Sequence, residues 1–445
     1  MIVLRNCTIV CLHPAEVRAG VDIRIEGTEI AAVSQGAASA GGVRAGGKDR
    51  IIDLAGRIVM PGLVCGHTHF YSALSRGILA RIGPCLDFVS TLANLWWRLD
   101  RAIDEDILRS SATIAAVEAV RAGCTAVIDH HASPSFIEGS LDVLKASLET
   151  VGLRGVLCYE TTDRNGRDGM EQGIAENERF ARLVEAEKGA RGKERLVEAM
   201  IGGHAAFTIP DEGLRSLGEV IGRTGRGFHV HAAEDAFDPS YSHRYHGKDL
   251  LARLDGFGLL AQPALVAHGL YLSAADREML NRKGAALAHN SRSNMNNCVG
   301  YNGSLADLRR VVLGTDGIGA DMLEEAKFAY FKNRDAGGTL TPGDVARFLQ
   351  AGSDALAGSF GERFGRVEEG FKADLAILDY DPPTPLVAEN LAGHLMFGMG
   401  SASVDTVIVN GRIVMENRRF PWDTGPVFAE ARRQAARLWK EMDRL

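Results

Sequence analysis

The stretch of sequence that decides the fold is Pro61-Gly62-Leu63-Val64-Cys65-Gly66-His67-Thr68-His69-Phe70. Apolar residues lead into it from residue 51, as in a buried strand, and it contains two histidines spaced i, i+2. On a β-strand this spacing places both imidazole rings on the same face, with their Cα atoms about 7 Å apart. Two such rings can bind one metal ion, because imidazole is a ligand for zinc, iron, copper and nickel. The pair alone is a weak signal, so further ligands must come from other strand ends.

The composition fits a globular chain and argues against several classes of protein. The 445 residues are 46% hydrophobic and 24% charged, and the formal net charge is −7. This acidic balance argues against nucleic acid as a partner, and the sequence has no apolar run of about 18 residues that would predict a membrane span. Seven cysteines without a CxxC pair, and an N-terminus without signal-peptide features, predict reduced thiols and a cytoplasmic location.

A repeated unit fills the middle of the chain: a short apolar run, a polar or glycine turn, and a helical segment. The apolar runs lie at 59–67, 124–130, 154–159, 197–203, 227–231, 264–268, 285–289 and 311–315. Parallel strands need helical crossovers, and strands that are buried on both faces are almost continuously apolar. Eight such repeats predict an α/β fold, a (β/α)8 TIM-like barrel over residues 59–361.

Both ends of the chain are predicted to be rich in strands and to pair with each other. Residues 1–58 contain short alternating strands with a hairpin at Gly27-Thr28, and residues 362–420 contain another at Asn410-Gly411. We therefore expect a small composite β-sandwich beside the barrel. The glycine- and alanine-rich stretch 36–50 is expected to be a surface loop. Residues 421–445 predict an amphipathic helix, which is our reason to expect a homo-oligomer, a dimer.

Polar residues interrupt the apolar strands at their C-terminal ends, where barrel enzymes build their active sites. The fifth strand leads into His231 and Glu234, the sixth ends in His268, and the eighth ends in Asp316. Together with the first-strand pair they predict a site for one divalent ion, bound by His67, His69, His231 and Asp316. Such an ion lowers the pKa of bound water towards neutrality. Asp316 could accept the proton of that water, while Glu234 and His268 would transfer protons and orient it.

Each of these residues also has an ordinary structural explanation. A single buried histidine at a strand end is more often a hydrogen-bonded core residue than a ligand. Asp316, which lies in a Thr-Asp-Gly sequence, could merely cap a turn. Five such coincidences, with the histidine pair counted as one, are improbable together at one rim of one barrel, so we favour the metal site.

Weaker candidates could contact a substrate at this rim, although packing or solvent exposure explains each of them as readily. His130 ends the second strand, and only one of His130 and His131 can face the pocket. Asn294 follows the seventh strand and could bind a heterocycle. Trp96 could stack on a ring, and Arg76 could meet a carbonyl or a carboxylate.

These motifs resemble the amidohydrolase superfamily, in the branch of cytosine, guanine, adenosine-type and triazine deaminases. The resemblance rests on PGLVCGHTH (61–69), HAAE (231–234), the His268 strand, HNSRSN (289–294) and LGTDG (313–317), and it covers nearly the whole chain. Within the branch, LWWRLDRAI (95–103) looks most like the SsnA-type aminohydrolases. The resemblance implies that His67, His69, His231 and Asp316 bind the metal and that Glu234 and His268 assist the water and the leaving group.

The number of metal ions follows from a missing lysine. Binuclear members of the family need a carbamylated lysine on strand 4, whereas neither 196–206 nor 154–160 contains one. We therefore expect a single metal ion, zinc or alternatively iron. His204 matches a position that contacts the substrate in related deaminases.

The function that the residues and the resemblance predict is metal-dependent hydrolytic deamination of an aminated nitrogen heterocycle, such as a purine, pterin, pyrimidine or triazine. Water attacks the ring carbon that bears the amino group, and ammonia leaves. A first alternative is a chlorohydrolase or cyclic-amide hydrolase with the same metal ligands. A second is a catalytically silent barrel with a binding role.

Overall fold

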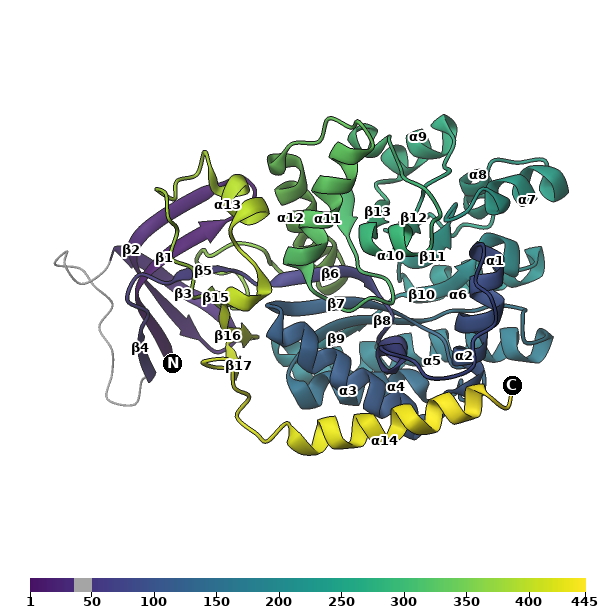
Figure 1. Ribbon diagram of the computed structural model, residues 1–445, viewed down its shortest axis with the longest axis horizontal. Coiled ribbons are helices and arrows are strands. Elements are labelled where there is room, and N and C mark those ends of the chain that lie inside the picture. Colours follow the sequence, from purple (N-terminus) through teal and green to yellow (C-terminus); the bar gives the residue numbers. More distant parts are fainter. Residues whose placement is uncertain (36–49) are drawn as a thin grey trace.

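The computed structural model describes residues 1–35 and 50–445. The expected loop at 36–50 therefore lies outside the described residues, apart from Arg50. Three sheets and the helices around them make up the described part of the chain (Figure 1).

Nine strands of the middle region form two parallel sheets that follow the chain in order. The four-stranded sheet consists of β6 (Leu63–Thr68), β7 (Cys124–His131), β8 (Arg154–Tyr159) and β9 (Val197–Ala199). The five-stranded sheet consists of β10 (Ile201–Ala205), β11 (Phe228–Ala232), β12 (Leu265–His268), β13 (Ala286–His289) and β14 (Val311–Leu313). Nearly all residues of these strands are buried, as the continuous apolar runs predict.

Isolated parallel bridges join the two sheets at both of their ends. Thr68 pairs with Asp316 between β6 and the end of β14, and Thr161 pairs with Gly203 between the end of β8 and β10. The predicted fourth strand, 197–203, is interrupted at Met200, whose N–H donates to Leu157 O while the next residue turns to the β11 side. The middle region of the chain therefore alternates between parallel strands and helices, and bridges connect its two sheets.

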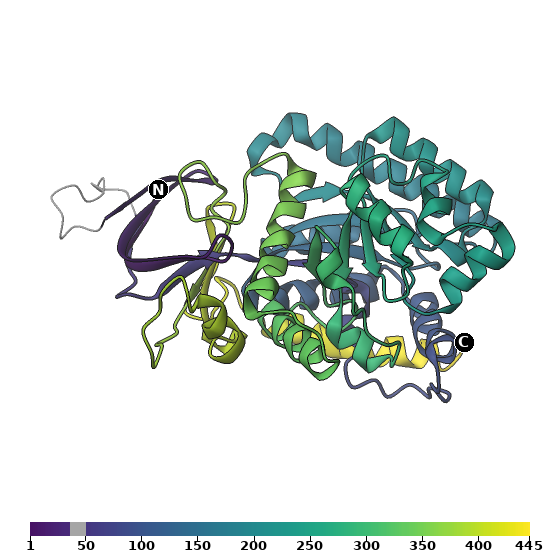
Figure 2. The ribbon, with the colours of Figure 1, turned by 90° about the horizontal axis from the view of Figure 1, so that it is seen from above.

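Helices follow most of these strands and lie outside them (Figure 2). The α-helices of the described residues are α1 (Phe88–Thr91), α2 (Trp97–Ala102), α3 (Glu105–Arg121), α4 (Ser140–Val151), α5 (Arg167–Arg191), α6 (Asp211–Thr224), α7 (Phe237–His246), α8 (Leu250–Asp255), α9 (Ala274–Lys283), α10 (Ser291–Asn296), α11 (Met322–Asp335), α12 (Pro342–Phe360), α13 (Leu391–Phe397) and α14 (Gly425–Met442); the last two follow strands of the terminal sheet. The boundaries of α12 show why these segments are helical. Thr341 and Asp344 form a capping box at its start, and Gly361 ends it in a left-handed conformation, with φ of 69°.

The two ends of the chain meet in one eight-stranded sheet, as predicted. Its strands are β1 (Ile2–Cys11), β2 (Glu16–Glu26), β3 (Glu29–Gln35), β4 (Arg50–Asp53), β5 (Ile58–Pro61), β15 (Leu375–Leu378), β16 (Val404–Val409) and β17 (Arg412–Met415). Both predicted hairpins, β2–β3 and β16–β17, are present. A separate core of apolar side chains from β1, β2, β5, β15 and β16 fills one side of this sheet. The strands thus form one continuous sheet, and its description as a two-layered sandwich stays a prediction.

One predicted strand, 59–67, is in fact two strands in different sheets. β5 pairs with β1 and β15 of the terminal sheet, whereas β6 pairs with β7. The chain changes sheets at Gly62, whose N–H donates to Asp374 O at 2.9 Å. A Cβ atom at this position would lie 2.1 Å from Thr125 Cγ2, so only glycine fits. The apolar character of both strands hides this junction in the sequence.

The C-terminal helix α14 packs on the chain itself. It lies along α3 and α2, and Leu438 and Met442 are fully buried there. The apolar side that suggested a subunit contact is thus used within the chain, and a dimer stays a prediction. Among the described helices, none is long and apolar enough to cross a membrane.

Candidate metal centre and active site

The two histidines of the opening motif lie side by side at the C-terminal end of β6. Their ring centroids are 4.9 Å apart, and both side chains are buried. His67 O accepts hydrogen bonds from the backbone N–H groups of Thr315 (2.8 Å) and Asp316 (3.0 Å). The end of β14 is thereby held against β6, although almost 250 residues separate the two strands in sequence.

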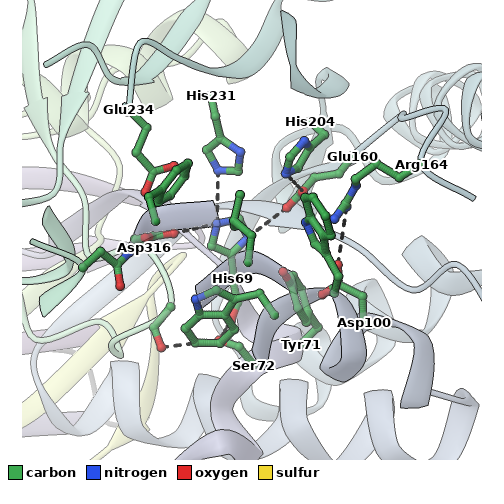
Figure 3. A pocket seen from close by; sticks show the side chains of 16 residues that line it. His69, Tyr71, Ser72, Asp100, Glu160, Arg164, His204, His231, Glu234 and Asp316 are labelled. Atoms are coloured by element: carbon green, nitrogen blue, oxygen red, sulfur yellow. Dashed lines mark hydrogen bonds and ion pairs between the residues drawn. The ribbon is translucent and has the colours of Figure 1, made fainter. Parts of the chain in front are cut away.

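His231 and Asp316 complete a compact cluster with this pair. Asp316 Oδ1 lies 2.7 Å from His69 Nε2 and 3.6 Å from His67 Nε2. His231 Nε2 lies 3.3 Å from His69 Nε2. The structure therefore brings together the four residues that were predicted to bind a metal, from β6, β11 and the end of β14 (Figure 3 shows three of them).

The donor set of this cluster fits a cation. The Nδ1–H of His69 points to His130 O, at 2.5 Å, so in the neutral form that binds a metal this ring has its lone pair on Nε2. That lone pair faces a nitrogen of His231 and a carboxylate oxygen of Asp316. Three atoms that can accept a hydrogen bond or bind a metal ion therefore point to the same place. His67 Nε2 is also buried without a hydrogen-bond partner among the described residues. Zinc-type ions suit such a set of imidazoles and one carboxylate.

The electrostatics of the cluster point the same way. Burial lowers the pKa of His69, but the neighbouring carboxylates of Asp316 and Glu160 outweigh burial and raise it well above its ordinary value. Burial would raise the pKa of Asp316, yet the neighbouring imidazoles of His67 and His69 hold it well below the usual range. Burial lowers the pKa of His67 to about 3, so this ring is neutral. The site is thus built to hold positive charge next to an ionised carboxylate.

Glu234 and His268 lie beside the cluster, as predicted. His268 Nε2 is 3.6 Å from Glu234 Oε2, and His268 Nδ1 is 2.8 Å from Asn294 Oδ1. Burial raises the pKa of Glu234 to about 7, so near neutral pH this carboxyl group can carry and release a proton. Asn294 was predicted to contact the substrate, but its side-chain oxygen contacts His268, whose ring it orients.

Two other predicted substrate contacts lie away from the pocket. His130 is fully buried and stacks on His229, with 4.3 Å between ring centroids, because its strand position points into the space beneath the cluster. Arg76 forms a bidentate ion pair with Glu118 on α3, at 2.7 and 2.8 Å, and its side chain is 68% exposed. The structure brings neither side chain into the pocket described next.

A pocket with many polar side chains in its wall opens over the cluster. Its wall includes the predicted residues Trp96 and His204. Burial lowers the pKa of His204 well below its ordinary value, so that ring is neutral. A mainly apolar recess adjoins the pocket and shares His204, His231 and Glu234 with it; its own wall is lined by Phe207, Phe237 and Tyr241.

The pocket wall also contains polar residues that the sequence did not predict, among them Tyr71, Asp100, Glu160 and Arg164 (Figure 3). Glu160 directly follows β8, so its place at a strand end is the signal in the sequence that could have indicated it. Arg164 pairs with Asp100 at 3.4 Å and lies over the ring of Trp97. That pair joins helix α2 to the loop after β8, and no local pattern in the sequence indicates it.

Comparisons with known proteins agree with this geometry. The model of the amidohydrolase family matches residues 58–414, and the chain therefore belongs to that family, which confirms the resemblance seen in the motifs. A relative from Pelotomaculum thermopropionicum, named 5-methylthioadenosine/S-adenosylhomocysteine deaminase, is 30% identical over 98% of both chains. Another from Methanosarcina mazei, named 5'-deoxyadenosine deaminase, is 29% identical over 98% of both chains.

Two solved structures share the fold. An adenosine deaminase from Xanthomonas campestris with bound zinc superposes with a TM-score of 0.83, at 23% identity and over 98% of both chains. Atrazine chlorohydrolase TrzN from Arthrobacter aurescens TC1, complexed with zinc, gives a TM-score of 0.79 at 20% identity, over 98% of this chain and 100% of the other. At these identities the likeness concerns the fold alone.

Proposed function

We propose that this chain is a hydrolytic deaminase of an aminated nitrogen heterocycle, with adenosine-like nucleosides as the first substrates to test. The observation that carries the proposal is the meeting of three imidazoles and Asp316 beside Glu234, a carboxyl group that can donate a proton near neutral pH. The names of the relatives support the same reaction and the adenosine-like class.

We propose a single zinc ion as the cofactor, with iron as the alternative, held by His67, His69, His231 and Asp316. When bound, such an ion lowers the pKa of a water molecule and supplies a nucleophile at neutral pH. The two zinc-containing structures of the same fold support zinc. Strands β8, β9 and β10 are described in full and contain no lysine. This supports a mononuclear site.

The chain's own residues would divide the proton transfers between them. Asp316 Oδ1 would accept a proton from the attacking water, because its low pKa keeps it ionised. Glu234 would donate its proton to the ring nitrogen next to the reacting carbon. His268, held by Asn294, would orient the water or stabilise charge on it. Trp96 and the buried wall of the pocket would exclude solvent from the ring.

Finer features of the architecture belong to the same proposal. We infer that the two parallel sheets form one closed (β/α)8 barrel, which the bridges Thr68–Asp316 and Thr161–Gly203 support. We also retain residues 1–58, 59–361, 362–420 and 421–445 as the division of the chain, an SsnA-like position within the family, a cytoplasmic location and a dimeric state.

The rival functions differ in the leaving group. A chlorohydrolase would use the same metal ligands, and one neighbour in fold bears that name. A cyclic-amide hydrolase would open the ring, and a silent barrel would bind no metal and turn nothing over. The relatives named as deaminases favour ammonia as the leaving group over these rivals.

The test is a screen of the purified protein against amino-substituted purine nucleosides, pterins, pyrimidines and triazines, with ammonia as the readout. We expect ammonia release from at least one class and about one zinc or iron ion per chain by elemental analysis. Chloride or ring-opened acid in place of ammonia would support a rival hydrolase. Protein without metal and without turnover would support the binding role.

A further inference from the structure

Glu160 is a buried carboxylate at the active site that the mechanism above leaves without a task. It directly follows β8, its backbone N–H donates to His131 O at 2.7 Å, and the residue is only 2% exposed. Its Oε1 lies 3.1 Å from His69 Nδ1 and 3.5 Å from His130 Nδ1. None of the hydrogen bonds within the described ranges reaches either carboxylate oxygen: Oε1 is fully buried, and Oε2 faces His204 (Figure 3).

His204 presents a second acceptor to the same space. The hydroxyl of Thr208 donates to Ala205 O at 3.0 Å, so its oxygen accepts the Nδ1–H of His204 at 2.9 Å. A neutral ring that carries its proton on Nδ1 has a lone pair on Nε2. That nitrogen lies 4.0 Å from Glu160 Oε2. Two acceptors at this separation cannot bond to each other, but one group with two N–H donors can bridge them.

The arrangement of the pocket indicates which group this is. In an amidine, the ring nitrogen and the exocyclic nitrogen lie on opposite sides of the carbon that water attacks. Glu234 and Glu160 line the same pocket, on opposite sides of His231 in Figure 3. If Glu234 protonates the ring nitrogen, the exocyclic amino group points towards Glu160 and His204. An amino group offers two N–H donors, whereas a chlorine substituent offers none.

We propose that Glu160 and His204 bind the exocyclic amino group that leaves as ammonia, and that Glu160 selects an amino over a chloride leaving group. This inference rests on the proposed deaminase function. Water adds its oxygen to the ring carbon, and the exocyclic C–N bond breaks with its electron pair on nitrogen. One water proton ends on the ring nitrogen and the other on the departing NH2, so NH3 leaves and no atom is oxidised or reduced. Chloride would leave as an anion, which the nearby carboxylate repels.

Two other roles for Glu160 make different predictions. Glu160 could act only through His69, by orienting that ligand as carboxylates commonly do for metal-bound histidines. In that case its loss would weaken metal binding and slow every substrate alike. Glu160, His204 and His231 could also hold a second cation, since their donor atoms lie within 4.8 Å of one another. His231 already belongs to the first cluster, so we favour the amino group.

The experiment compares the metal-loaded wild type with Glu160→Gln on pairs of probes that differ only in the leaving group. Adenosine is paired with 6-chloropurine riboside, and an amino-s-triazine with its chloro counterpart; the readouts are kcat, KM, released ammonia or chloride, and zinc per chain. We expect Glu160→Gln to lower kcat/KM for the amino probe about 10- to 150-fold, the size of a hydrogen bond to a charged group. Turnover of the chloro probe and zinc content should stay unchanged or rise.

Two further variants make the result specific. His204→Asn should produce the same selective loss, and it serves where Glu160→Gln does not fold. Glu178→Gln removes a carboxylate of α5 that pairs with Arg223. This control should leave kcat/KM unchanged for both probes. Equal losses on amino and chloro probes, loss of zinc in Glu160→Gln, or two zinc ions in the wild type would each overturn the inference. A wild type that releases no ammonia from any ring amine would contradict the proposed function, and the inference with it.

Discussion

Asp316 and His268 both adopt a left-handed backbone conformation, with φ of 52° and 71°. For a residue other than glycine, such a conformation costs the folded state about 1–3 kcal/mol. It persists only where the surrounding structure imposes it. The imposing contacts are visible: Asp316 N–H is held by His67 O, and the His268 ring is held by Asn294. Asp316 and His268 therefore adopt strained backbone conformations that reduce local stability, and in these conformations their side chains lie at the site.

Asp316 combines two tasks, so a small change should be costly. Asp316→Asn keeps the size of the side chain but removes the charge that the imidazoles face. We expect ammonia release to fall by about 10²- to 10⁴-fold, the usual value of a general base, and bound metal to fall as well. Steady-state rates and elemental analysis test this. Asp307→Asn, at an exposed position, is the control, and full turnover by Asp316→Asn would refute the assignment.

The raised pKa of Glu234 predicts a pH dependence. The protonated carboxyl group is the proton donor, and burial raises its pKa to about 7. The donor form is therefore present below pH 7 and is lost as the pH rises through that value, so kcat/KM should fall on the alkaline side. Glu234→Gln should abolish that descending limb and most of the activity. A wild-type rate that keeps rising above pH 7 would contradict the role of Glu234 as the acid.

At the scale of elements, the junction between β5 and β6 sets the position of the metal-binding strand. Three contacts hold it: β5 pairs with β15, Gly62 N–H donates to Asp374 O, and Leu63 N–H donates to Gly123 O. The histidines follow within one strand length. A shift by one residue here would turn both imidazoles to the opposite face, because side chains alternate along a strand.

Gly62→Ala tests this junction. The added methyl group would meet Thr125 side-chain atoms at 2.1–2.6 Å, so the strands must move apart. We expect a loss of about 1–3 kcal/mol in the free energy of unfolding and a fall in bound metal. Denaturant titration and elemental analysis measure both. Gly189→Ala, in α5 with nothing within 4 Å of the new atom, should instead leave stability unchanged or raise it.

At the scale of the whole molecule, the terminal sheet is attached to the parallel sheets through a buried arginine. Arg154, the first residue of β8, bonds to Asp374 at 2.8 and 3.1 Å and to Asn410 at 2.9 Å. Its guanidinium also lies over the rings of Phe360 and Phe364. One side chain thus links residues from the middle of the chain with two strands near its C-terminal end.

Breaking this link should destabilise the molecule. Arg154→Met leaves Asp374 buried without its charged partner, which costs about 3–5 kcal/mol. The double variant Arg154→Met with Asp374→Leu should recover part of that loss, since no buried charge remains. Thermal unfolding of the wild type, both single variants and the double variant measures the coupling. Additive effects of the two substitutions would argue that the pair does not act as a unit.

Metal removal should also affect the whole molecule. A ligand that binds only the folded state stabilises it, so chelation is expected to lower the melting temperature as well as the activity. Zinc or iron added back should restore both, and comparing the two ions tests the identity of the metal. A melting temperature that does not respond to chelation, in protein from which metal has been removed, would refute a structural contribution of the ion.

Much of this protein can be predicted from sequence because its signals are local. Nearly continuous apolar runs, strand-end histidines and the Asn-Gly hairpin depend only on neighbouring residues, so each of the eight predicted regions contains a strand and the predicted ligands lie close together. Because side chains alternate along a strand, the sequence also predicts that only one of the neighbours His130 and His131 can face the pocket.

Tertiary structure alone decided the remainder, because it concerns residues that are distant in sequence. The passage from β5 to β6 depends on which sheet each half joins, and both halves are equally apolar. Arg76 turned out to pair with Glu118, while Asp100, Glu160 and Arg164 entered the pocket wall. The sequence by itself determined which residue types could bind a metal ion at strand ends. The distances between those residues, and the polar wall above them, follow from the packing of strands and loops, which no short stretch of sequence contains.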